Sequence, residues 1–177
     1  LLIDECFIPF LEDPAAHSSI NRLAANENLI LLRAFTKWYA MAGLRLGYAL
    51  CGSPGTARRL REFGPPWAVS LPAQEAGVAA LREKEYDAAL RGLIREGRRQ
   101  LLSGLTELGM EVIPGEANFL LFFSRDASLC EKLRPKGILL RDCRNFAGLG
   151  VGWYRTAIRT EEENNALLAA LSEVIHD

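Results

Sequence analysis

The sequence predicts an α/β fold, and three observations support this class. Short runs of branched apolar residues, such as LLID at residues 1–4 and LILLRAF at residues 29–35, are typical of parallel strands covered on both faces. Longer stretches, clearest over residues 86–108, carry apolar residues every three or four positions, as one face of a helix does. The chain has 177 residues, 49% of them apolar, which suffices for one domain or two small ones.

The first half of the chain is expected to form three strands, over residues 1–4, 29–35 and 46–52. All three match the parallel pattern. Ligands of parallel sheets bind beyond the carboxyl ends of the strands, where Asp4 and Lys37 are located. A helix is predicted over residues 70–81, because Ser70 suits the N-cap and a proline occupies the first turn.

The second half is expected to open with a long helix over residues 86–108, which Gly109 terminates. Three strands and a short helix follow, the strands over residues 118–123, 138–143 and 153–159 and the helix over residues 128–133. Thr160 and Glu163 have the spacing of a capping box and predict the start of a last helix. The apolar stripe of this helix comprises Leu167, Leu168, Leu171, Val174 and Ile175.

Composition and charge argue against several classes of partner. The 21 basic and 22 acidic residues give a net charge of −1, which disfavours a nucleic acid or a membrane surface held by bulk charge. No apolar stretch approaches the roughly 18 uninterrupted residues of a membrane span. The four cysteines lack the paired spacing of a metal site, so we expect reduced thiols, no metal and a cytoplasmic protein.

The stretch LLRAFTKWYAMAGLRLGYAL, residues 31–50, places charged side chains in an apolar region. Lys37 could simply extend its amine to solvent, as most lysines do. Alternatively, desolvation and a neighbouring cation could lower its pKa, so that it forms a Schiff base with an aldehyde. Arg45 also has two interpretations, as a solvated turn arginine or as a guanidinium that donates two parallel hydrogen bonds to a phosphate.

Asp4 ends an apolar strand, and it is either a turn acceptor for the following loop or the partner of a buried nitrogen cation. Taken together, Asp4, Lys37 and Arg45 suit one ligand that has a protonated ring nitrogen, an aldehyde and a phosphate. Pyridoxal 5'-phosphate (PLP) has these three groups, and proteins hold it through a lysine and an acidic partner of the pyridinium nitrogen.

Four segments, DECF, FTKWYAMAGLRLGYAL, ANFLLF and YRTAIRTEEEN, resemble in their order and spacing the fold-type I PLP-dependent aminotransferases of class I/II. Within this family the chain looks most similar to the branch of the histidinol-phosphate aminotransferases and the threonine-phosphate decarboxylases. The resemblance covers essentially the whole chain but only the C-terminal half of the family's usual length. It implies the end of the parallel sheet of the large PLP-binding domain over residues 1–90 and a small α/β domain over residues 91–177.

The resemblance implies roles for four residues around the cofactor. Lys37 matches the lysine that forms the internal aldimine, and Asp4 matches the partner of the pyridinium nitrogen. Arg45 matches the phosphate-binding arginine, and Thr36 matches a hydroxyl residue that also contacts the phosphate.

Two arginines of the second half are the expected substrate anchors. Arg155 matches the small-domain arginine that binds the substrate α-carboxylate. Alternation along a strand places Arg159 on the same face, as a solvated strand-end charge or as a second anchor for an anionic substrate. Two positions depart from the family: Phe7 replaces a tyrosine that donates to the cofactor's phenolic oxygen, and Ala34 replaces a hydroxyl residue used for phosphate.

From the resemblance we expect an L-threonine-O-3-phosphate decarboxylase-like enzyme of cobalamin biosynthesis, a homodimer that acts on a small phosphorylated amino acid. The segments PPWAVSLPAQ, RDCRNFAGLG and IRTEEEN favour this enzyme over a histidinol-phosphate-type aminotransferase. A third interpretation is an inactive truncated fragment, because the N-terminal segments that complete the family's cofactor pocket are missing from these 177 residues.

Overall fold

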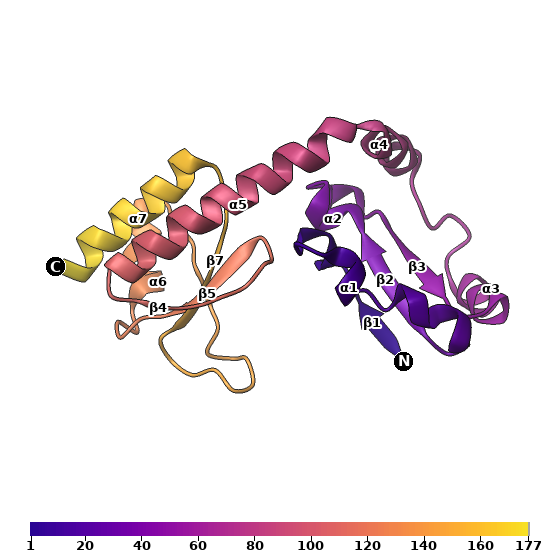
Figure 1. Cartoon of the computed structure of the whole chain (residues 1–177), viewed down its shortest axis with the longest axis horizontal. Coiled ribbons are helices and arrows are strands. Elements are labelled where there is room, and N and C mark those ends of the chain that lie inside the picture. The colour runs from indigo at the N-terminus through magenta and orange to yellow at the C-terminus, as the bar shows by residue number, and fades with distance from the viewer. Residues whose placement is uncertain (177) are drawn as a thin grey trace. The chain divides into compact units, whose positions relative to one another are not determined.

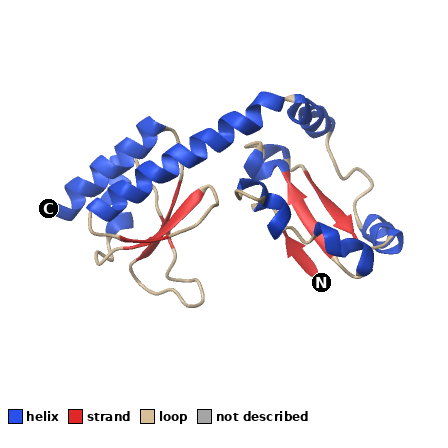
Figure 2. Ribbon diagram, in the orientation of Figure 1, coloured by secondary structure: helices blue, strands red, loops and turns tan. Residues whose placement is uncertain are grey.

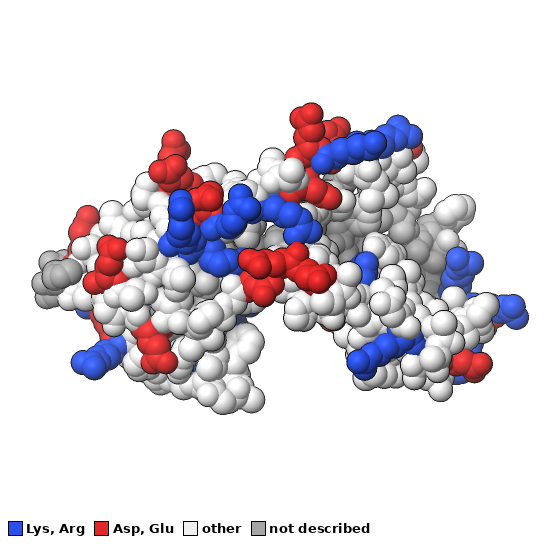
Figure 3. Space-filling view, viewed as in Figure 1, with Lys and Arg blue, Asp and Glu red and all other residues white. Residues whose placement is uncertain are grey.

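The computed structural model of the chain describes residues 1–176 and divides into two compact units, Leu1–Glu85 and Tyr86–Asp177. Figure 1 labels the elements, and Figure 2 shows that each unit has one sheet with helices beside it. Within the described residues, no helix is both long and apolar enough to cross a bilayer. Basic and acidic side chains lie close together on the face shown in Figure 3.

The first unit contains a three-stranded sheet formed by β1 (Leu2–Asp4), β2 (Ile30–Ala34) and β3 (Gly47–Cys51). β1 and β2 are parallel, as predicted, but β3 is antiparallel to β2. The prediction of a third parallel strand is wrong because two left-handed residues, Ala40 (φ 53°) and Arg45 (φ 55°), turn the chain back within one short connection. The predicted coverage of both faces is also wrong for β1, since Leu2 is 57% exposed.

The helices of this unit are α1 (Pro14–His17), α2 (Phe35–Trp38), α3 (Pro54–Phe63) and α4 (Leu71–Arg82), with the short 3-10 turns η1 (Ile8–Phe10), η2 (Ile20–Ala25) and η3 (Ala42–Leu44). The helix predicted over residues 70–81 is confirmed as α4, and the Ser70 hydroxyl caps its first turn. α4 packs closely on the β2–β3 connection, because a Cβ at Gly77 would lie 2.5 Å from Leu46 Cδ2. This packing holds the backbone next to Arg45.

The second unit contains a four-stranded antiparallel sheet in the order β4-β5-β7-β6. Its elements are α5 (Lys84–Glu107), β4 (Glu111–Ile113), β5 (Phe119–Phe123), α6 (Leu129–Leu133), η4 (Arg134–Lys136), β6 (Arg141–Asp142), β7 (Trp153–Ala157) and α7 (Glu161–His176). Alternate residues of the two central strands are buried, namely Leu120, Phe122, Tyr154 and Thr156. α5 and α7 run along this buried face (Figure 1), where a Cβ at Gly97 of α5 would lie 2.7 Å from Ile158.

The helices predicted for this unit are confirmed. The helix over residues 86–108 is α5, and the short helix over residues 128–133 is α6. The capping box forms at α7, because the Thr160 hydroxyl accepts a hydrogen bond from the Glu163 amide and the Glu163 carboxylate accepts one from the Thr160 amide, each at 3.4 Å. The buried members of the predicted α7 stripe are Leu167, Leu171 and Val174.

Two predicted strands are shorter than expected. The strand predicted over residues 138–143 contains only Arg141–Asp142, and the strand predicted over residues 153–159 ends at Ala157. The second strand ends early because Asn164, 1% exposed, binds the amide and the carbonyl of Arg159, each at 3.1 Å. These hydrogen bonds take the place of a neighbouring strand.

Asp126 links the β5–α6 loop to both helices of this region. Its carboxylate accepts hydrogen bonds from Lys132 Nζ at 2.8 Å and from the Ser128 hydroxyl at 2.6 Å, and Lys132 Nζ also donates to the Val174 carbonyl of α7 at 3.1 Å. The Lys132 and Ser128 hydrogen bonds lower the pKa of Asp126 from 3.8 to about 2. The ionised carboxylate therefore stabilises the folded chain above pH 3.8, and this contribution is lost as the pH falls towards 2.

We expect Asp126→Asn to lower the melting temperature at neutral pH by about 2–4 °C, since the pair is partly exposed. The difference from the parent protein should shrink as the pH falls through the interval from 3.8 to about 2. Thermal melts followed by circular dichroism over this pH range measure both effects, with Glu131→Gln as a control for loss of an acidic side chain in α6. Equal melting temperatures at neutral pH would contradict the assigned role of Asp126.

Candidate functional site

Lys37 occupies the third position of α2, the single helical turn that begins directly after β2. Phe35 and Trp38 point into the core, with exposures of 9% and 5%. The intervening Thr36 is half-buried and Lys37 is exposed. The Lys37 amine lies 5.8 Å from the centre of the Phe7 ring, which belongs to the loop after β1. The structure thus places an accessible amine beside the loop that follows β1.

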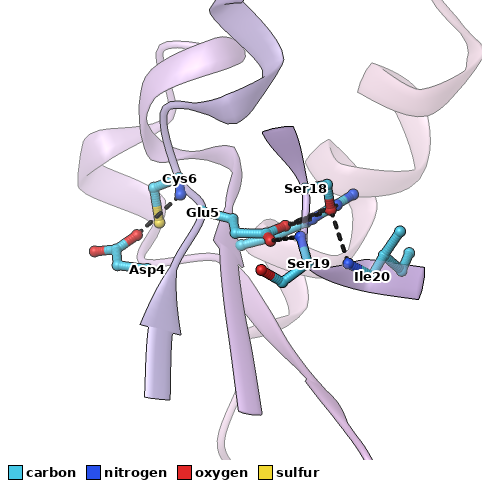
Figure 4. A network of polar contacts seen from close by, with 7 residues as sticks. Asp4, Glu5, Cys6, Ser18, Ser19 and Ile20 are labelled. Atoms are coloured by element: carbon cyan, nitrogen blue, oxygen red, sulfur yellow. Dashed lines mark hydrogen bonds and ion pairs between the residues drawn. The ribbon is translucent and has the colours of Figure 1, made fainter. Parts of the chain in front are cut away.

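Asp4 is the last residue of β1 and carries a charged carboxylate. The Cys6 thiol and the Cys6 amide, the latter at 2.9 Å, donate hydrogen bonds that hold the pKa of Asp4 below its usual range (Figure 4). Burial, followed by the contact with Asp4, raises the pKa of the Cys6 thiol to about 11, and the charge of Lys37 acts in the opposite direction. Cys6 is therefore within electrostatic reach of both Asp4 and Lys37, which lie at one edge of the sheet.

Arg45 has a left-handed backbone, with φ 55° and ψ 42°, at the end of η3. Its guanidinium donates to the Ala42 carbonyl at 3.0 Å and forms no ion pair with a described carboxylate. A non-glycine residue in this conformation is strained, and such strain clusters at ligand sites. The side chain is exposed, so it retains donors for an anion.

Arg155 projects from β7 onto the sheet face opposite the buried one. Its guanidinium lies over the Phe119 ring, 4.7 Å from the ring centre. The direct cross-strand partner of Arg155 is Arg141 of β6, so two arginines emerge side by side on one face. Arg141 contacts the Phe146 ring at 5.6 Å and the Asn145 side chain at 3.2 Å. Neither arginine forms an ion pair with a described carboxylate, which leaves paired positive charge for an anion.

The sequence does not single out Arg141. The segments RDC and WYRTAIR place one arginine in each expected strand, but the pairing register that makes these arginines neighbours cannot be read from either segment alone. The signal available in the sequence is an arginine directly after the apolar residues 138–140, within the strand expected over residues 138–143.

The expected position of Arg159 is wrong. β7 ends before this residue, and its side chain forms an ion pair with Glu163 at 2.6 Å and is 64% exposed. It lines a cleft of about 620 Å³ together with residues of α5 and the start of α7, namely Leu93, Glu96, Gly97, Arg99, Gln100, Ser103 and Glu161. Because α5 packs on the buried face of the sheet, Arg159 does not share the face of Arg155.

These groups define a class of protein. One unit carries an amine, a carboxylate and an unpaired guanidinium near the ends of its strands, and the other carries two adjacent arginines on an open sheet face. Within the part of the chain that the structure describes, no cluster of three or more His, Cys, Asp or Glu side chains is placed to bind a metal. Each unit therefore presents guanidinium groups of the kind that suit a small anionic ligand.

Residues 1–171 match the family described as aminotransferase class I and II, and the chain belongs to this family. It is 37% identical over 178 aligned positions to the threonine-phosphate decarboxylase of Salmonella typhimurium, a match that covers 99% of this chain and 48% of that protein. It is 35% identical over 175 positions to histidinol-phosphate aminotransferase 2 of Archaeoglobus fulgidus, which covers 98% of this chain and 49% of that protein.

The structure of histidinol-phosphate aminotransferase from Sinorhizobium meliloti, in complex with pyridoxal-5'-phosphate, matches with a TM-score of 0.88 at 27% identity, covering 99% of this chain and 48% of that one. The chain therefore spans about half the length of the relatives that it matches. The predicted family, the predicted PLP-transferase fold and the predicted membership of an enzyme superfamily are confirmed. The roles of the individual residues remain predictions.

Proposed function

We propose that the polypeptide carrying this chain uses PLP to decarboxylate a small phosphorylated amino acid, L-threonine O-3-phosphate. The observation that carries this proposal is the accessible Lys37 amine at the same sheet edge as the ionised Asp4 carboxylate. The PLP-bound relative and the family membership support the cofactor. The similarity to the Salmonella decarboxylase and the segments PPWAVSLPAQ and RDCRNFAGLG support the reaction.

The residues of the first unit fit the three functional groups of PLP. Lys37 offers an amine for the aldehyde, and Asp4, held charged by Cys6, suits a protonated ring nitrogen. Arg45 and the hydroxyl of Thr36 lie on the same β2–β3 connection and suit the phosphate. Cys6 satisfies only part of the hydrogen-bonding capacity of Asp4, so the carboxylate retains acceptor positions for a ligand.

The mechanism divides the work between these side chains. PLP, when bound, supplies an electron sink for the pair released at the substrate Cα. Asp4 would hold the proton of the ring nitrogen, because the hydrogen bonds from Cys6 lower its pKa and leave the carboxylate anionic. Lys37, whose side chain is exposed, would return a proton to Cα as general acid.

We propose that the paired arginines of the second unit bind the anionic groups of the substrate. Arg155 and its cross-strand neighbour Arg141 offer two guanidinium groups on one face. The way in which these arginines would hold the substrate carboxylate is expected to decide between loss of carbon dioxide and transamination.

The second candidate is a histidinol-phosphate-type aminotransferase, which the similarity to the Archaeoglobus enzyme favours. Its substrate, like threonine phosphate, would bring a phosphate and an amine. Transamination would require the amino group to pass to a keto-acid acceptor such as 2-oxoglutarate, which decarboxylation does not need.

The two candidates are separated by supplying the polypeptide that carries this chain with carboxyl-labelled threonine phosphate. We expect release of labelled carbon dioxide without 2-oxoglutarate and without formation of a keto acid. Formation of keto acid without carbon dioxide when 2-oxoglutarate is supplied would overturn the decarboxylase proposal in favour of the aminotransferase. A colourless preparation that binds no added PLP would instead support a chain that holds no cofactor.

We also infer from the family resemblance that the protein is a cytoplasmic homodimer. Size-exclusion chromatography with light scattering tests the dimer, and a single-chain mass would contradict it. Fractionation of the producing cells tests the cytoplasmic location, and recovery outside the cytoplasm would contradict that location.

A further inference from the structure

Glu5 is a buried acidic residue that the proposed chemistry does not use. It is 2% exposed and follows Asp4 directly, and its side chain points away from that of Asp4 (Figure 4). One of its carboxylate oxygens accepts hydrogen bonds from Arg33 Nε at 3.2 Å, Arg33 Nη2 at 2.9 Å and the Ser18 hydroxyl at 2.9 Å. The other oxygen accepts a hydrogen bond from the Ser19 amide at 2.7 Å. Every contact is at normal hydrogen-bonding distance, so the buried charge is compensated.

The network joins three segments that are far apart in the sequence. Glu5 lies just after β1, Ser18 and Ser19 lie between α1 and η2, and Arg33 lies in β2. The Glu5 amide also donates to the Leu32 carbonyl at 2.9 Å, which extends the β1–β2 ladder by one residue. Register at the ends of the two parallel strands is therefore fixed both by the backbone and by the side chains.

Both members of the ion pair, Glu5 and Arg33, are stabilised in their charged forms. Burial opposes ionisation of Glu5, but the hydrogen bonds from Ser19, Arg33 and Ser18 outweigh it and hold the pKa of Glu5 below its usual range. Desolvation likewise opposes the charge of Arg33. The contacts of Arg33 with Glu5 and Tyr48 outweigh this effect and raise the pKa of the guanidinium. Removing either partner would leave an uncompensated charge in a poorly solvated place.

The position of the pair suggests what it does. Glu5 is one residue after Asp4, and Arg33 is four residues before Lys37, so each member is attached to a segment that carries a group of the proposed cofactor site. The ion pair and its hydrogen bonds connect the two segments through side chains of defined geometry.

We propose that Glu5 and Arg33 are positioning residues that set the spacing between Asp4 and Lys37. This inference rests on the proposed function, because the spacing matters for a ligand that contacts both groups. Neither residue is a catalytic residue, since each acts through the backbone of its segment and not on the ligand itself.

The test uses the full polypeptide that carries this chain, with Glu5→Gln, Arg33→Gln and the double variant. The control is Glu173→Gln, which removes a carboxylate from an ion pair with Lys136 that is 63% exposed on the glutamate side. Amide hydrogen exchange of residues 4–6 and 33–37 in the cofactor-free protein reports the positions of the segments without any reaction. Absorbance of the PLP-loaded protein as a function of pH reports the environment of Lys37.

We expect each single variant to raise hydrogen exchange in the two segments at least about tenfold and to shift the midpoint of the absorbance titration by about one pH unit. The double variant leaves no unpaired charge, so we expect its melting temperature to return towards that of the parent protein while the titration midpoint stays shifted. A midpoint that returns together with the melting temperature would show that the pair acts on stability alone and would overturn the inference.

Unchanged amide hydrogen exchange of the two segments in folded single variants would also overturn the inference that Glu5 and Arg33 set their spacing. Failure of the parent protein to bind PLP would overturn the proposed function instead, and the exchange measurement separates the two results because it needs no cofactor.

Discussion

Replacing Lys37 with alanine is expected to abolish the absorbance of bound PLP in its lysine-linked form and to lower turnover at least about a thousandfold. Lys37 is the exposed amine of α2, beside the loop that carries Asp4 and Phe7. A methyl side chain supplies neither the bond to the aldehyde nor the proton for Cα. Absorbance spectra and single-turnover assays of the polypeptide that carries this chain measure the two losses separately.

Lys136→Ala is the matched control, because this lysine is also exposed and pairs with Glu173 in the second unit, away from the Lys37 turn in the sequence. A small primary amine added to the Lys37→Ala variant should restore part of the turnover by carrying the proton. If the variant kept its absorbance and turnover, another amine would hold the cofactor and the assignment of Lys37 would be wrong.

Parts of the fold with strong local signals can be predicted from the sequence. α4 and α7 are predictable because Ser70 and Thr160 bond to amides within the same turn, so the sequence contains both partners of each cap. The direction of β3 is not predictable in this way. It depends on Ala40 and Arg45 adopting left-handed conformations, which a pattern of apolar residues does not encode.

Some residues of the candidate site can likewise be predicted from the sequence, whereas others are found only from the three-dimensional structure. Asp4 ends β1 and Lys37 follows β2, and because these strands are parallel neighbours, the shared edge of the two residues follows from strand order alone. Arg141 is found only from the register of β6 against β7. Glu5 is missed because acidic residues are rarely buried, and only the three-dimensional contacts with Arg33 and the two serines explain why this one is.

The position predicted for Arg159 fails for a related reason. Alternation along a strand assumes that the strand continues, and here a side chain five residues later ends it. Asn164 can reach the backbone of Arg159 only because α7 folds back beside the end of β7. Arg141, and not Arg159, is therefore the neighbour of Arg155 on its sheet face, and the substrate-binding roles of these arginines stay predictions.

Substituting alanine for Arg141 or Arg155 is expected to weaken binding of the phosphorylated amino acid by about 10- to 100-fold, the loss that corresponds to a charge-assisted hydrogen bond. The two substitutions should not be additive, because two guanidinium groups that bind one molecule share a ligand. Isothermal titration of the parent protein, both single variants and the double variant gives this coupling. Arg125→Ala, an exposed arginine in the β5–α6 loop, controls for loss of positive charge in this unit.

Stability measurements on the same four proteins give the coupling free energy between Arg141 and Arg155 in folding. We expect its sign to be opposite to that of their coupling in binding. Like charges directly opposite each other on neighbouring strands repel, by about 0.2–1 kcal/mol. Arg155 and Arg141 are such a pair, so the coupling between them in urea denaturation without substrate should be unfavourable. A pair that is unfavourable for folding and favourable for binding is retained for its ligand. Favourable coupling without substrate, or unchanged binding in both single variants, would show that the two arginines are not an anion site.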